Sequence, residues 1–235
     1  MTADTLIIVA AYNEAERIGA TLGALARAFP GAQVWVADDG STDRTPEIAR
    51  EAGAWVVRSE RVIGKGGAVT EAALAALEQA SQPAAGIEGG EPVFLLCDGD
   101  LACTAGGLGP LVDAVRAGET DLAVAAFERR VGGGLGLAVG FARWAIRRRC
   151  GLDVRAPISG QRALSPRLLR NVLPFAADFG MEVGMTIDAV RAGYRVSEIQ
   201  LDLEHRATGR TLPGFTHRAR QLIDFVRVYV ARPDI

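Results

Sequence analysis

The sequence predicts an α/β protein in which helices cover both faces of a doubly wound, mostly parallel sheet of the Rossmann-like type. Short apolar runs alternate with longer segments of helical spacing, which is the pattern that builds parallel sheets. Each run ends in a turn that is polar, acidic or contains glycine. Hydrophobic residues make up 49% and charged residues 23% of the 235 residues, which is typical of a globular chain with a substantial core.

Residues 1–100 are expected to form strands and helices in the order β-α-β-α-β-α-β. Strands are predicted over 6–10, 34–37, 55–57 and 94–97, where apolar residues follow one another. Helices are predicted over 14–29, 48–52 and 64–80, and the first carries Ile18, Leu22, Leu25 and Phe29 on one face. After a helix at 105–117 and a strand at 122–127, helices are predicted at 137–150, 166–172 and 181–190. A turn at 159–162, a strand at 196–203 and a helix at 215–230 complete the expected elements.

The composition restricts which partners the protein can bind and indicates its cellular compartment. A net charge of -2 argues against a general nucleic-acid binder. Three cysteines without a CxxC spacing indicate a reducing compartment and no cysteine-based metal cluster. The first residues lack the features of a signal peptide, and no apolar stretch reaches the roughly 18 residues of a membrane-spanning helix. We therefore expect a cytoplasmic protein, at most attached to the inner face of the plasma membrane.

Polar residues follow each of the first four predicted strands. In a parallel sheet these strand ends meet at one edge, so we expect a single crevice lined by Asn13, Asp39, Lys65, Asp98 and Asp100. The pair of aspartates follows the most apolar run, and the glycine between them allows both carboxylates to reach one cation. Taken alone, the Asp-Gly-Asp segment is explained more simply as a polar turn.

Five motifs in this order resemble glycosyltransferase family 2, whose members have the GT-A fold. They are Ala11-Tyr12-Asn13-Glu14, Asp38-Asp39-Gly40-Ser41, Gly64-Lys65-Gly66, Asp98-Gly99-Asp100 and Ser159-Gly160-Gln161-Arg162. Within the family the chain resembles dolichyl- or polyprenyl-phosphate sugar transferases and glucosyl-3-phosphoglycerate synthase. The resemblance implies one domain over 1–235, with a nucleotide-sugar-binding half at 1–103, an acceptor-binding half at 104–212 and a C-terminal helix at 213–235.

The resemblance implies metal-dependent transfer of a sugar from a UDP- or GDP-sugar donor. Asp39 has an alternative role as the cap of the next helix, and Lys65, the only lysine of the chain, has an alternative as a surface residue. At the start of a helix, an ammonium group adds to the attraction of free N–H donors for phosphate. The donor site is implied to comprise Ala11, Tyr12, Asn13, Glu14, Asp39, Gly40, Lys65, Asp98, Gly99, Arg206 and Arg210.

The implied metal site is formed by Asp98, Asp100 and His205, with Mg²⁺ or Mn²⁺ as the cofactor. Mg²⁺ is commonly shared between one or two carboxylates and substrate phosphates, whereas imidazole suits Mn²⁺ better. Such an ion would neutralise the leaving diphosphate as a Lewis acid. A structural role for the histidine stays open, because a lone histidine is often structural.

On the acceptor side, the resemblance gives Glu182 and Arg162 catalytic roles beside Asp100. Glu182 would take the proton of an attacking hydroxyl, and Arg162 would hold an acceptor phosphate. A phosphate acceptor needs no base, so Glu182 would then orient groups, and a simple place in the first turn of a helix is its alternative. The implied acceptor is a phosphorylated compound, either a polyprenyl phosphate or a small soluble molecule.

The segment 129–149 is rich in arginine and carries Phe141 and Trp144 among its apolar residues. Such a helix is suited to the headgroup region of an anionic membrane, which predicts peripheral membrane association. The alternative is an amphipathic helix whose apolar side faces the core. Assembly into a homodimer is also considered.

Three other classes of protein share some of these sequence features. A nucleotidyltransferase also uses a doubly wound sheet with aspartates, but its glycine-rich, basic first loop is missing. An NAD(P)-binding enzyme would rely on residues 134–140, whose glycines miss the GxGxxG spacing. A non-catalytic sugar- or lipid-binding module would keep its ligand when the metal is removed, whereas transfer would stop.

Overall fold

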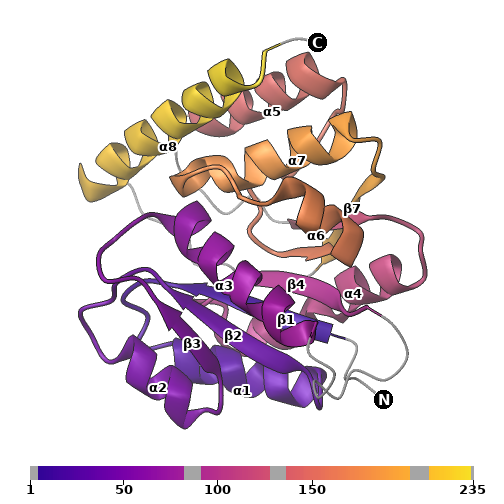
Figure 1. Cartoon of the computed structure of the whole chain (residues 1–235). Coiled ribbons are helices and arrows are strands. Elements are labelled where there is room, and N and C mark those ends of the chain that lie inside the picture. The colour runs from indigo at the N-terminus through magenta and orange to yellow at the C-terminus, as the bar shows by residue number, and fades with distance from the viewer. Residues whose placement is uncertain (1–4, 82–90, 128–135, 202–211, 234–235) are drawn as a thin grey trace.

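The computed structural model contains a seven-stranded sheet with helices on both faces (Figure 1). It describes residues 5–81, 91–127, 136–201 and 212–233. The strands are β1 (Thr5–Ala11), β2 (Gln33–Asp38), β3 (Trp55–Arg58), β4 (Val93–Asp98), β5 (Leu122–Phe127), β6 (Arg162–Leu164) and β7 (Val196–Leu201). Their order is β3-β2-β1-β4-β6-β5-β7. Only β6 runs antiparallel to its neighbours, so the predicted mostly parallel α/β sheet is confirmed.

Two buried clusters cover the two faces of the sheet. Along β1, Ile7 and Val9 face one cluster while Leu6 and Ile8 face the other, as expected for a strand buried on both sides. The first cluster contains side chains of α1 (Ile18–Ala28), α2 (Thr45–Glu51) and α4 (Gly109–Arg116). The second contains side chains of α3 (Lys65–Ala80), α6 (Pro166–Val172) and α7 (Met181–Arg191).

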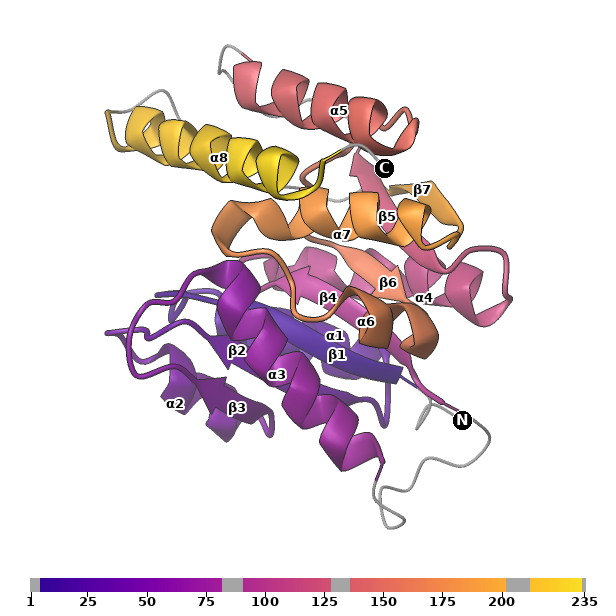
Figure 2. The ribbon, with the colours of Figure 1, turned by 45° about the horizontal axis from the view of Figure 1, so that its top comes forward.

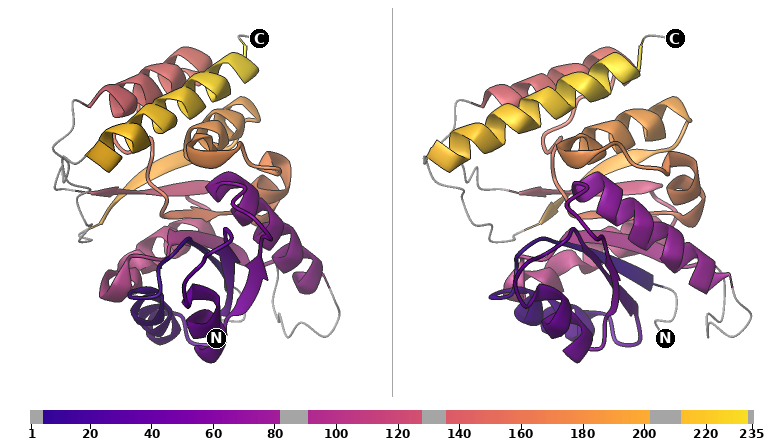
Figure 3. Two further views of the ribbon diagram at one scale, coloured as in Figure 1. Left: turned by 90° about the vertical axis from the view of Figure 1, so that its left-hand side faces the viewer. Right: turned by 60° about the vertical axis from the view of Figure 1, so that its left-hand side comes forward.

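A further layer lies on the side of α7 that faces away from the sheet. It consists of α5 (Leu137–Cys150) and α8 (Leu212–Ala231), which run side by side (Figures 2 and 3). Phe225 and Val228 of α8 pack with Ile146 of α5 and Val183 of α7 in a third buried cluster. Helix α8 is therefore packed against α5 and α7.

Several predicted boundaries were wrong. The first helix begins at Ile18 rather than residue 14, and side chains of the 41–45 turn bind the backbone N–H groups of Asn13, Glu14 and Ala15 ahead of it. The predicted helix 105–117 is divided into a 3₁₀ helix, η1 (Ala102–Leu108), and α4. Strand β6 was missed, since three residues are too few for a periodic pattern. The ranges of α5 and α6 are confirmed as predicted.

Candidate active site

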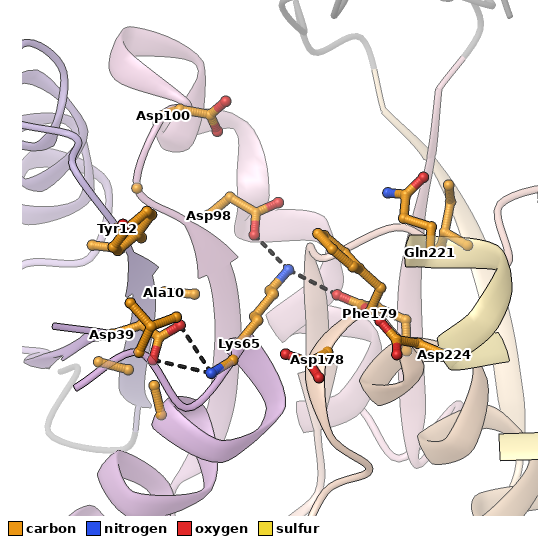
Figure 4. Close-up of a pocket in the computed structure, with 18 of the residues that line it drawn as sticks. Ala10, Tyr12, Asp39, Lys65, Asp98, Asp100, Asp178, Phe179, Gln221 and Asp224 are labelled. Carbon is orange, nitrogen blue, oxygen red and sulfur yellow. Dashed lines mark hydrogen bonds and ion pairs between the residues drawn. The ribbon is translucent and has the colours of Figure 1, made fainter. Parts of the chain in front are cut away.

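A cavity of about 880 Å³ lies at the carboxyl ends of β1, β2 and β4. The opposite wall comes from the short 3₁₀ helix η2 (Asp178–Gly180), the first turn of α7, and α8. Figure 4 shows this arrangement, with Asp39, Lys65 and Asp98 on one side and Asp178, Phe179 and Asp224 on the other. The sequence-predicted residues that line it are Ala11, Tyr12, Glu14, Asp39, Lys65, Asp98, Gly99, Asp100 and Glu182.

Residues that follow β1 line the cavity and also connect two turns by a hydrogen bond. Tyr12 is 48% exposed and lines the cavity. Asn13 does not line it; its Oδ1 accepts a hydrogen bond from the Thr42 backbone N–H at 2.8 Å, which joins the turns after β1 and β2. Burial, followed by the charge of Asp100, raises the pKa of Glu14 above its ordinary value.

The turn after β2 holds the start of α3. The Asp39 carboxylate accepts hydrogen bonds from the backbone N–H groups of Ile63 at 2.7 Å and Gly64 at 3.0 Å. Burial raises the pKa of Asp39, and these two N–H donors oppose the shift. Asp39 therefore does not cap α2. Gly40 has a φ of 71°, and a Cβ there would lie 3.0 Å from the Arg61 carbonyl carbon, so the turn requires glycine.

Lys65 joins the two sides of the cavity. Its Nζ donates to Asp98 Oδ1 at 2.6 Å and to Glu182 Oε1 at 2.7 Å (Figure 4). Burial alone would lower the pKa of Lys65, but the two carboxylates outweigh burial and raise the pKa above its ordinary value. Glu182 is only 4% exposed, so its carboxylate lies at the inner wall of the cavity.

The Asp-Gly-Asp segment follows β4 as predicted. Gly99 donates its backbone N–H to the Ala10 carbonyl oxygen at 2.8 Å, which holds this turn against the end of β1. Asp98 points toward Lys65, and its Oδ2 accepts from Gln161 Nε2 at 2.7 Å. Asp100 lies farther from Lys65 at the same edge of the cavity (Figure 4).

The described residues contain no group of three His, Cys, Asp or Glu side chains that could hold a metal ion. His205, Arg206 and Arg210 lie outside the described residues. Asp98 and Asp100 nevertheless offer two carboxylates at one strand end. These fit the common Mg²⁺ arrangement, in which substrate phosphates supply further oxygen ligands.

The structure does not bring Arg162 to the cavity. Its side chain is 0% exposed, and its guanidinium donates to the carbonyl oxygens of Ser159 and Pro157 and to Thr186 Oγ1. A guanidinium enclosed in this way cannot reach an acceptor phosphate. We therefore correct the prediction that Arg162 contacts the acceptor.

Sequence reasoning missed most of the wall opposite the strand ends. Asp178 lines the cavity from η2, and Gln221 and Asp224 line it from α8. One signal was available for Asp224. It lies next to Phe225 on the buried side of an otherwise amphipathic helix, where a charged residue is unexpected. Asp178 gave no such signal, because it follows a segment without periodic spacing.

Comparison with known proteins identifies the family. A model of Glycosyl transferase family 2 matches residues 6–148. The chain belongs to glycosyltransferase family 2. It is therefore an enzyme of the glycosyltransferase class, as the sequence predicted, and its sheet and flanking helices correspond to the GT-A type.

Two curated relatives of this family 2 chain are named as enzymes that act on lipid phosphates. An undecaprenyl-phosphate mannosyltransferase of Micrococcus luteus is 30% identical over 222 residues, covering 88% of this chain and 86% of that protein. A dolichyl-phosphate hexose transferase of Haloferax volcanii is 44% identical over 72 residues. That match spans only 31% of each protein.

Solved structures of glucosyl-3-phosphoglycerate synthase from Mycobacterium tuberculosis are similar to this family 2 chain over most of its length. One is 28% identical with a TM-score of 0.72, covering 98% of this chain and 81% of that one. Another, 27% identical with the same TM-score and coverage, contains Mn²⁺, UDP-glucose and glycerol 3-phosphate.

Proposed function

We propose that this enzyme transfers a sugar from a UDP- or GDP-sugar to a phosphorylated acceptor, and that the acceptor is a polyprenyl phosphate. The observation that carries the proposal is a cavity in which strand-end residues face Glu182 across Lys65. We propose that the donor binds at the strand ends, since open α/β sheets bind ligands at the carboxyl ends of their strands. The names of the lipid-phosphate relatives support the choice of acceptor.

The charge of the cavity supports a requirement for a divalent cation. Among the residues that the structure describes, Lys65 and Arg227 are the cationic side chains of the lining, and each is already paired with a carboxylate. A nucleoside diphosphate would add negative charge to a wall rich in acids, and like charges repel strongly where water is excluded. The acidic side chains of the lining are Glu14, Asp39, Asp98, Asp100, Asp178, Glu182 and Asp224.

Asp98 and Asp100 are the residues that would hold Mg²⁺ or Mn²⁺, and the ion would stabilise the negative charge that develops on the leaving diphosphate. Asp39 would face the nucleoside, since its carboxylate is fixed by the backbone at the start of α3. Glu182 would orient the acceptor or, for a hydroxyl acceptor, take its proton. The carboxylates of Asp39, Asp98 and Glu182 are already held by neighbouring groups of the chain.

The outer surface of α5 and α8 supports delivery of the acceptor from a membrane. Leu137 and Trp144 of α5 are 67% and 47% exposed, and Ile223, Val226 and Val230 of α8 are 51%, 40% and 68% exposed. We call these five residues the outer apolar face. Ile223 also lines the cavity, so this face adjoins its wall.

Charge on the same layer favours an anionic bilayer. Helix α5 contains no acidic residue, and its last turn carries Arg147, Arg148 and Arg149. Arginines beside exposed Trp and Val suit the headgroup region of anionic lipids. In the described part of the chain, no helix combines the length and the hydrophobicity needed to cross a membrane. We propose peripheral attachment, at the cytoplasmic face, through α5 and α8.

Vesicle binding tests this attachment. The wild-type protein should co-sediment with phosphatidylglycerol-containing vesicles, and added salt should weaken the interaction. Replacing Val226 and Val230 with serine should lower binding by about tenfold or more, since each buried side chain contributes on the order of 1 kcal/mol. Leu74→Ser is the control, because Leu74 is 53% exposed on α3. No vesicle binding, or equal loss in the control, would contradict the proposal.

Transfer assays decide between the acceptors. Purified enzyme with UDP- or GDP-sugars and Mn²⁺ should glycosylate a short polyprenyl phosphate faster than glycerol 3-phosphate or 3-phosphoglycerate. The glucosyl-3-phosphoglycerate synthase structures make a small soluble acceptor the second candidate, and faster transfer to these compounds would favour it. Homodimer formation remains a prediction.

A further inference from the structure

The segment Pro157–Arg162 lies against Asp98, one of the two carboxylates that hold Lys65. Gln161 is 2% exposed, and its Nε2 donates to Asp98 Oδ2 at 2.7 Å, while Lys65 donates to the other oxygen, Oδ1. The Gln161 side chain is itself fixed, since its Oε1 accepts from Ser159 Oγ at 3.3 Å. Both oxygens of Asp98 are thus held by side chains of the protein, which sets the orientation of the carboxylate.

Gly160 allows the segment Pro157–Arg162 to approach Asp98 and Lys65 closely. A Cβ at this position would lie 2.5 Å from Asp98 Oδ2 and 2.6 Å from Lys65 Nζ. Any side chain would therefore push the ammonium or the carboxylate away. The absence of a side chain at residue 160 is a condition for the contact between Lys65 and Asp98.

The buried Arg162 side chain holds the segment Pro157–Arg162 against α7. Its Nε donates to the Ser159 carbonyl oxygen at 2.7 Å, and its Nη1 donates to Thr186 Oγ1 at 2.9 Å. The Thr186 hydroxyl in turn donates to the carbonyl oxygen of Glu182 at 2.9 Å, one turn earlier in α7. A buried charge is costly unless its donors are satisfied, so this guanidinium is suited to hold the two pieces of backbone together.

We propose that Gln161 and Arg162 are positioning residues, which hold Lys65 between Asp98 and Glu182 and so fix the donor side of the cavity relative to the acceptor side. Gln161 acts on Asp98 directly. Arg162 acts through Ser159 and Thr186. The effect of these two residues on sugar transfer rests on the proposed function. Their effect on the position of Lys65 does not.

The single lysine of the chain makes this geometry measurable. In protein labelled with ¹⁵Nζ-lysine, the NMR spectrum reports Lys65 alone, and hydrogen bonds to Asp98 and Glu182 should slow exchange of the ammonium hydrogens. Gln161→Met, Arg162→Met and Gly160→Ala should each shift the Lys65 signal and speed its exchange several-fold. Gly140→Ala is the matched control, since a Cβ there meets nothing within 4 Å.

Kinetics then connect the geometry to transfer. Gln161→Met should lower kcat by about tenfold to a hundredfold, since it misplaces Asp98, a proposed ligand of the ion at the leaving diphosphate. Arg162→Lys should recover part of the kcat lost in Arg162→Met, because an ammonium can still donate to Ser159.

The two failures are distinguishable. An unchanged Lys65 signal in folded Gln161→Met and Arg162→Met would overturn the positioning roles, whatever the activity. A wild-type kcat in these variants would overturn their effect on transfer. If the wild type transfers no sugar while the Lys65 signal responds as expected, the proposed function fails and the geometry stands.

Discussion

The two walls of the cavity are built in different ways. One wall, which we propose binds the donor and call the donor wall, consists of turns at the ends of adjacent parallel strands. Backbone N–H groups of Ile63 and Gly64 hold the Asp39 carboxylate, and a backbone hydrogen bond from Gly99 to Ala10 holds the turn after β4. The opposite wall, which we propose binds the acceptor and call the acceptor wall, is assembled from η2, α7 and α8, whose residues come together only through helix packing. The donor wall is therefore set by sheet topology, whereas the acceptor wall depends on tertiary contacts far apart in the sequence.

The largest expected effect is on the donor wall, at Asp100. Asp100→Ala should reduce transfer by at least about a hundredfold, because it removes a proposed ligand of the ion that stabilises the leaving diphosphate. The fold should be retained, since the side chain lies at the cavity edge and outside the core. Transfer rates and thermal unfolding of the same sample check both points. The matched control is Asp113→Ala on α4, whose side chain is 72% exposed, and wild-type turnover of Asp100→Ala would remove the metal assignment.

A second prediction concerns the contact between the two walls. Lys65→Met should lower the free energy of unfolding by about 1–3 kcal/mol, because it leaves the carboxylates of Asp98 and Glu182 without their shared cation. Arg50→Met, which breaks an exposed pair with Glu47, should cost less than about 1 kcal/mol. Chemical denaturation measures both, and equal losses would show that the walls are not joined through Lys65.

The raised pKa of Lys65 also sets how the stability difference between wild type and Lys65→Met depends on pH. A cation with a raised folded-state pKa contributes fully below its unfolded value of about 10.4, and loses its contribution only as the pH rises through the higher folded-state pKa. The stability difference between wild type and Lys65→Met should thus be constant between about pH 7 and 9. A decline within this range would contradict the pairing.

The smallest effect is expected at Asp39. Its raised pKa means that folding favours the protonated form, so its ionisation destabilises the fold as the pH rises from the unfolded value of about 3.9 through the folded one. Asp39→Asn keeps an acceptor for Ile63 and Gly64 and should be more stable than wild type at neutral pH, by less than about 1 kcal/mol. The gain should shrink toward pH 4, and a gain independent of pH would contradict this reading.

The contrast between the walls also explains what could be predicted from the sequence. Asp39, Lys65, Asp98 and Asp100 follow recognisable strands or begin a helix, so the edge rule for parallel sheets brought them together. The antiparallel strand β6 was too short to recognise, and with it the place of Arg162 was missed. Local patterns do not specify how α8 packs, so Asp224 and Gln221 could not be placed beside the donor wall.

The central claim is that the strand-end wall binds a nucleotide sugar together with a divalent cation. The most direct measurement is a thermal-unfolding panel of UDP- and GDP-sugars with Mg²⁺, with Mn²⁺ and without metal. Ligands that bind only the folded state raise its stability, by about 2.7 kcal/mol at a hundred times Kd. We predict a clear rise for at least one nucleotide sugar with metal, and little rise for either component alone. Absence of any shift across the panel, or an equal shift without metal, would contradict the account.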